Sequence, residues 1–90
     1  MIAVTEPAKK ELRRILSDKV DNPLGVLRLI SSHQGLGLIV DIEMPGDEVV
    51  KYENIKVLVV EKLLADSLQD VTLDVEDTLE GPELVIVNKE

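Results

Sequence analysis

The sequence offers few side chains that could do chemistry, and its single histidine is the first to consider. His33 lies between two apolar segments, where an imidazole could act as a general base or a metal ligand. A metal site needs several ligands, and this chain has no cysteine and no second histidine to join His33. An exposed, inert loop residue is therefore the simpler interpretation of His33.

A cluster of carboxylates near the end of the chain is the second candidate. Its members are Asp74, Glu76, Asp77, Glu80 and Glu83. Carboxylate oxygens suit hard cations such as calcium or iron, and Asp74 and Glu76 would lie on the same side of a strand. The spacing is not that of an EF-hand loop, and carboxylates on strand faces are usually solvated. Metal binding by His33, Asp74 and Glu76 is thus an alternative hypothesis.

The remaining motifs do not support catalysis. Gly35 and Gly37 form a Gly-x-Gly pattern, but a strand is expected after them, whereas a phosphate-binding loop needs a helix there. The serines at 31, 32 and 67 have no nearby base with an orienting acid. We therefore predict no catalytic residue, no cofactor and no enzymatic activity.

Composition limits the fold to one small aliphatic domain. Of the 90 residues, 44% are hydrophobic, only 1% are aromatic and none is cysteine. The length allows a single domain, residues 1–90, with a thin core. The absence of cysteine excludes disulfides, thiolate-held iron–sulfur clusters, cysteine zinc sites and cysteine nucleophiles.

The net charge restricts the partners. A charge of −8 disfavours nucleic acid and anionic membranes, and favours basic protein surfaces or cations. The first residues lack a basic segment followed by an apolar one, and no apolar run is long enough to span a bilayer. We expect a cytoplasmic protein with protein partners, among them a second copy of itself.

The charge is also unevenly distributed along the chain. Residues 1–40 carry a net charge of +2 and residues 41–90 a net charge of −10. Four cations, Lys9, Lys10, Arg13 and Arg14, fall away from the apolar stripe of an expected helix, and we call them the basic helix face. This face or the acidic second half could meet a partner, although the asymmetry could equally serve solubility alone.

Hydrophobic periodicity predicts an α+β domain, rich in β-structure. A short apolar segment at 2–4 precedes a helix at 6–19, with Thr5 as its cap and Pro7 in its first turn. The expected strands are 26–30, 36–44, 48–52, 55–60, 71–76 and 83–88, with a short helix at 61–68. Turn residues separate them, and the first two strands should form a hairpin.

The order of these segments resembles the HesB/IscA-like, or A-type iron–sulfur carrier, family. The resemblance rests on the Thr5-x-x-Ala8 start with its Lys/Arg-rich helix, Leu27-Arg28-Leu29, residues 50–60, the block around Thr72-Leu73-Asp74, and Leu84 to Asn88. It covers nearly the whole chain. It implies a HesB-like domain with mixed and antiparallel sheets, and a tendency to form dimers or tetramers.

The resemblance also implies three cysteine ligands, none of which this chain has. The first family position falls at Gly35 or Leu36, depending on which glycine is matched. The other two form a Cys-x-Cys pair after an Asn-Pro; here Lys89 follows Asn88, and the sequence ends at Glu90. Cysteine-free relatives of a DsrR-like type, associated with bacterial sulfur oxidation, resemble this pattern. The leading hypothesis is a non-enzymatic scaffold that works through protein contacts, accessory or regulatory to iron–sulfur or sulfur metabolism.

Overall fold

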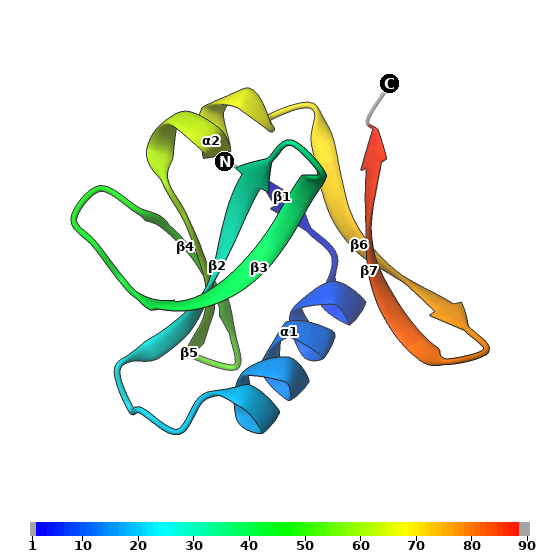
Figure 1. Cartoon of the computed structure of the whole chain (residues 1–90), viewed down its shortest axis with the longest axis horizontal. Helices are drawn as coiled ribbons and strands as arrows, with labels where there is room; N and C mark the ends of the chain where they lie inside the picture. The colour runs from blue at the N-terminus through cyan, green and yellow to red at the C-terminus, as the bar shows by residue number, and fades with distance from the viewer. Residues whose placement is uncertain (1, 89–90) are drawn as a thin grey trace.

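The structure, a computed structural model, describes residues 2–88 and has the predicted α+β layout (Figure 1). In chain order the elements are β1 (Ala3–Val4), α1 (Glu6–Lys19), β2 (Gly25–Ser32), β3 (Gly35–Ile42), β4 (Glu48–Tyr52), β5 (Ile55–Val60), α2 (Lys62–Ser67), β6 (Val71–Thr78) and β7 (Gly81–Asn88). The helix predicted at 6–19 and the strands predicted at 48–52 and 55–60 are confirmed.

The strands form two mixed sheets. One has the order β3-β2-β5-β4 and the other the order β1-β6-β7, and in each sheet one neighbouring pair is parallel, β2 with β5 and β1 with β6. Several predicted strand ends were wrong by a few residues: β2 and β7 are longer than expected, whereas β3 ends at Ile42 instead of residue 44. The longer strands result from pairing, because a hairpin ladder continues to its turn whatever the hydrophobicity of the last residues. Strand β3 ends at Ile42 because that residue pairs with Gly25, the first residue of β2.

Helix α1 begins and ends where its flanking residues dictate. The Thr5 side chain accepts a hydrogen bond from the Ala8 amide, and Pro7 occupies the first turn, where no amide donor is needed. After Val20 the chain turns back tightly at Gly25. A Cβ at Gly25 would clash with Val20 Cγ1, so the close approach of this loop to the helix end requires glycine.

The core lies between α1 and the two sheets. Figure 1 shows α1 between the four-stranded sheet and the three-stranded sheet, and the helix contacts strands of both. Its buried apolar residues are Ala8, Leu12 and Leu16, in the stripe that the sequence predicted. Opposite them, four consecutive residues of β5, Val57 to Val60, are completely buried. No helix among residues 2–88 is long and apolar enough to cross a membrane.

Two tight turns show how backbone conformation selects residues. Between β4 and β5, Glu53 and Asn54 both have positive φ angles of 52° and 68°, as the two central residues of a type I′ hairpin turn require. Between β2 and β3, Gly35 has φ of +108°, a region that side-chain-bearing residues rarely adopt. Both turns lie where the sequence predicted them.

The first testable prediction concerns this thin core. Replacing the fully buried Leu12 by alanine should lower the free energy of unfolding by about 2 to 5 kcal/mol, because the cavity between helix and sheet cannot be refilled. The matched control is Leu63→Ala on α2, where the side chain is exposed and the loss should stay below about 0.5 kcal/mol. Urea unfolding followed by circular dichroism measures both; equal losses would contradict this description of the core.

Candidate functional site

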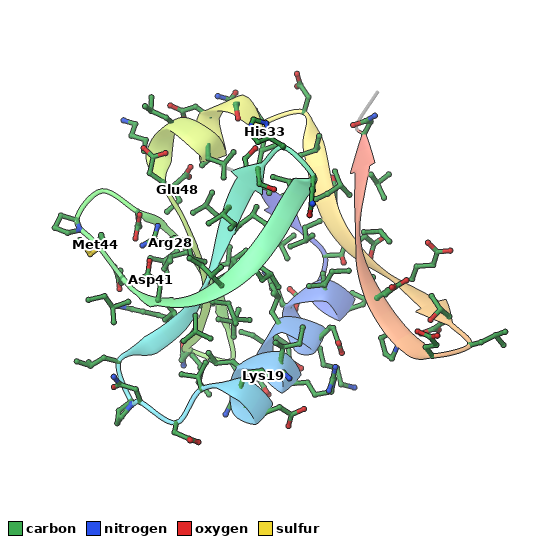
Figure 2. All side chains as sticks on the ribbon, viewed as in Figure 1. Lys19, Arg28, His33, Asp41, Met44 and Glu48 are labelled. Atoms are coloured by element: carbon green, nitrogen blue, oxygen red, sulfur yellow. The ribbon has the colours of Figure 1, made fainter. Side chains whose placement is uncertain are left out.

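The β2–β3 hairpin carries His33 and the first position that corresponds to a family cysteine. His33 is exposed in the two-residue turn, and in Figure 2 it lies at the opposite end of the hairpin from Asp41. Gly35 has a positive φ, so a side chain there would be strained, and Leu36 is half-buried against the core. The hairpin tip therefore presents an isolated imidazole beside a backbone turn.

Asp74, a second predicted ligand, has a structural role at the start of α1. Its Oδ1 accepts a hydrogen bond from Thr5 Oγ1 at 2.7 Å and another from the Val75 amide at 2.8 Å. The hydrogen bond from Thr5 is the main reason why the pKa of Asp74 lies below its usual value. Since Thr5 also caps α1, this contact ties the helix to β6.

Glu76, the third predicted ligand, is exposed and lies directly opposite Glu83 in the β6–β7 ladder. Two like charges at paired positions repel each other, and this pairing slightly weakens the hairpin. The structure does not bring His33 together with these carboxylates. Among residues 2–88, no group of three or more histidine, cysteine, aspartate or glutamate side chains is arranged to hold a metal ion.

The basic helix face is partly neutralised within α1. Lys9 pairs with Glu6 at 3.3 Å, and Arg14 pairs with Glu11 at 2.6 Å and Asp18 at 3.0 Å. Arg14 also keeps the pKa of the buried Glu11 carboxyl below its usual value. Arg13 donates a hydrogen bond to Ser17, and neither it nor Lys10 forms an ion pair within residues 2–88. Lys10 and Arg13 are thus the cations of this face that no carboxylate of the described residues pairs with.

The most elaborate polar cluster is one that the sequence did not single out. Arg28 on β2 donates from Nε to Asp41 at 2.7 Å, and from Nη1 and Nη2 to the two Asp47 oxygens at 3.0 and 2.6 Å. Its Nη2 also donates to the Ile42 carbonyl at 3.0 Å. Figure 2 shows Arg28 and Asp41 together beside the long loop that leads into β4. We call these three charged side chains the Arg28 cluster.

Two of the three members of the Arg28 cluster are buried, and the cluster carries one positive and two negative charges. The Arg28 side chain is 11% exposed and that of Asp47 only 4%. Arg28 lowers the pKa of Asp47, while the Ile42 amide and then Arg28 lower that of Asp41; the carboxylates in turn raise the pKa of Arg28. Asp47 additionally accepts from the Met44 amide at 2.8 Å, which fixes the loop.

The cluster closes the face of the four-stranded sheet that α1 does not cover. By strand register, Arg28 shares this face with Val26, Asp41 and Val59, and both valines are buried although they lie outside the main core. Because four guanidinium N–H groups are already engaged, the cluster is not an anion-binding site. The available sequence signal was an arginine inside the apolar run of residues 26–30, which in a buried strand needs carboxylate partners.

An open groove lies beside this cluster. It has a volume of about 1060 Å³ and runs between the end of α1, the loop into β2, the end of β3 and the β4–β5 turn. Four exposed apolar side chains line it, namely Leu24, Ile42, Met44 and Ile55, and Arg13 stands at its border. The ion pair between Lys56 and Glu43 at 2.6 Å crosses its rim.

Comparison with known proteins finds solved structures with the same fold. No protein-family model and no curated protein sequence matches the chain. Among solved structures, Escherichia coli SufA, described as involved in the biosynthesis of iron–sulfur clusters, superposes with a TM-score of 0.69 at 15% identity, covering 97% of this chain and 84% of SufA. This chain has the SufA/IscA fold.

Two further structures agree. IscA with its [2Fe-2S] cluster superposes with a TM-score of 0.63 at 17% identity, covering 98% of this chain and 85% of IscA. A protein from Aquifex aeolicus gives a TM-score of 0.61 at 19% identity, covering 97% and 90% of the two chains. The SufA/IscA fold is therefore present in a chain that contains no cysteine at any of its 90 positions.

The Arg28 cluster yields a prediction about stability and pH. Asp47→Asn should lower the free energy of unfolding by about 2 to 3 kcal/mol at neutral pH, because it leaves a buried guanidinium with one carboxylate fewer. The pKa of Asp47 is depressed in the folded state, so its contribution is present above the unfolded value near 4 and is lost as the pH falls through the folded value. The variant should therefore lose less stability on acidification than the wild type.

Denaturant unfolding between about pH 3 and 7 measures this difference. Glu43→Gln is the control, because its ion pair with Lys56 is half-exposed and should contribute less than about 1 kcal/mol. An Asp47→Asn profile parallel to that of the wild type would show that the cluster does not carry the acid sensitivity.

Proposed function

We propose that this protein is a non-enzymatic module that uses the SufA/IscA fold for contacts with other proteins and does not carry an iron–sulfur cluster. The observation that supports this proposal is the SufA/IscA fold in a sequence without a single thiol. A cluster held by thiolates needs cysteine sulfur, and neither Gly35 nor Leu36 supplies a substitute ligand. Without ligands for a cluster, the protein can still act through contacts at its surface. The role we propose is accessory or regulatory to iron–sulfur or sulfur metabolism.

The basic helix face is the surface we assign to partner contact. Lys10 and Arg13 lie three residues apart on α1 and therefore on neighbouring positions of one helix face. Since they have no carboxylate partner within residues 2–88, their charge is available to an acidic protein surface. Such a contact would be local, because the rest of the chain is strongly acidic and repels acidic partners elsewhere.

Charge reversal on α1 tests this assignment. The double variant Lys10→Glu/Arg13→Glu should lose partner proteins that the wild type retains from a lysate of the native cell, because acidic surfaces would then be repelled. The matched control is Lys51→Glu/Lys62→Glu, two exposed lysines outside α1 that give the same change in net charge. Quantitative mass spectrometry compares the proteins retained by the wild type and by each of the two double variants.

If both double variants lose the same partners, the loss is caused by the change in net charge and not by the basic helix face. If neither loses any, the basic helix face is not the contact surface. Circular dichroism must show that each variant is folded like the wild type.

The second candidate function is a metal carrier that uses His33 and carboxylates, among them Asp74 and Glu76, in place of cysteines. Its proposed ligands are spread over the β2–β3 turn and β6, and Asp74 is already bonded to Thr5. It would need a second copy of the chain, or a rearrangement of the hairpins, to assemble a ligand set.

Calorimetric titration of chelator-treated protein with ferrous iron distinguishes the two functions. The contact module should give no saturable heat, whereas a carrier should give a saturable isotherm that His33→Ala abolishes. Saturable binding with a defined stoichiometry, lost in the His33 variant, would overturn the proposal of a metal-free module.

A further inference from the structure

The open groove presents large apolar side chains on loops that hydrogen bonds hold in place. Leu24 is 75% exposed, Met44 51% and Ile42 47%, and all three line the groove. In the loop that carries Leu24, the Asn22 Oδ1 accepts from the Leu24 amide at 2.9 Å. In the loop that carries Met44, Asp47 accepts from the Met44 amide at 2.8 Å. Apolar side chains gathered on such a surface mark a contact site.

The charges that line the groove favour a partner with a carboxylate. Lys56 and Glu43 neutralise each other at 2.6 Å. Arg13 donates to the neutral Ser17 hydroxyl, and within residues 2–88 no carboxylate pairs with it. A guanidinium can bind a carboxylate through two parallel hydrogen bonds, so Arg13 is a ready anchor for an acidic group.

The lining also contains one acidic group that gives the groove a direction. Asp21 is exposed and forms no ion pair in the described part of the chain. Arg13 lies in the middle of α1, whereas Asp21 follows the C-terminal end of this helix. An occupant therefore needs its carboxylate beside the middle of α1 and no negative charge beside the end of α1.

The open shape of the groove suits a helix better than a small molecule. A small-molecule site covers most of the surface of its ligand, whereas this groove of about 1060 Å³ is open to solvent. A helix with one apolar face keeps its polar face in water, so it needs cover on one side only. A helix of ten residues is about 15 Å long, which is well within the 36 × 33 × 27 Å extents of the molecule.

We propose that the open groove binds an amphipathic helix of a partner protein. Apolar side chains of that helix lie against Leu24, Met44 and Ile55, and one of its carboxylates pairs with Arg13. Beside Asp21 the helix carries a neutral or basic residue, because like charges repel. This inference rests on the proposed function, since Arg13 also belongs to the basic helix face, and it names the kind of segment that the partner supplies.

A display library of random helical peptides of about 14 residues tests the inference without a lysate. Selection on the wild type should enrich peptides with apolar residues at helical spacing and an acidic residue toward one end. Leu24→Glu should not bind these peptides. The matched control is Leu63→Glu on α2, because Leu63 is 74% exposed and lies outside the groove; it should bind them like the wild type.

The affinity of one enriched peptide then tests the contact with Arg13. Fluorescence anisotropy should show that Arg13→Gln raises the dissociation constant about tenfold, because a charge-assisted hydrogen bond is lost. Replacing the acidic residue of the peptide by its amide should cost the same. The two changes together should cost no more than either alone, since the two groups act on each other. Circular dichroism establishes that every protein variant is folded.

Several outcomes would overturn the inference. The first is a library that yields no binder, or binders that Leu24→Glu retains. The second is a set of peptides with alternating apolar residues, because that pattern belongs to an added strand. The third is dodecanoate, used as a probe, binding with the same dependence on Leu24 and Arg13 when no peptide does, which would assign the groove to a small apolar acid.

Failure of the groove and failure of the proposed function are distinguishable. Partners from the native lysate that Lys10→Glu/Arg13→Glu loses and Leu24→Glu retains would leave the proposed function standing and exclude the groove from the contact. Groove-dependent peptides combined with no partner lost by Lys10→Glu/Arg13→Glu would support the groove and contradict the assignment of the basic helix face.

Discussion

The complete burial of the last four residues of β5 is the constraint on which the rest of this structure depends. Val57 to Val60 are fully buried, and successive residues of a strand point to opposite faces of its sheet. Both faces must therefore be covered, in a chain with no tryptophan, phenylalanine or disulfide to help. Helix α1 covers one face with small and branched aliphatic side chains, and the Arg28 cluster with its loop closes the other.

The Arg28 cluster is an unusual solution to that second requirement. A buried guanidinium is costly unless its donors are satisfied, so Arg28 needs Asp41, Asp47 and the Ile42 carbonyl together. The bidentate bond to Asp47 fixes the loop between β3 and β4, and this loop forms one wall of the open groove. The Arg28 cluster thus covers the sheet face that α1 leaves open and also fixes one wall of the exposed groove.

The functional interpretation follows from what the SufA/IscA fold retains without its ligands. Thiolate chemistry is impossible without cysteine, and several polar side chains are already committed to the fold, as Asp74 is to Thr5 and Asp47 to Arg28. Within residues 2–88, Lys10 and Arg13 on α1 form no ion pair with a carboxylate, and β3 is an edge strand of its sheet.

The sequence by itself determined the local structure. Capping by Thr5, the apolar stripe of α1, the turn at Glu53-Asn54 and the alternation along the strands depend on neighbouring residues, so they could be predicted, as could the absence of thiol chemistry. Only the tertiary structure decided which distant side chains meet. It paired Arg28 with an aspartate 19 residues later and Thr5 with one 69 residues later, and it left β3 at an edge. Long-range pairing depends on strand order, which hydrophobic periodicity does not encode.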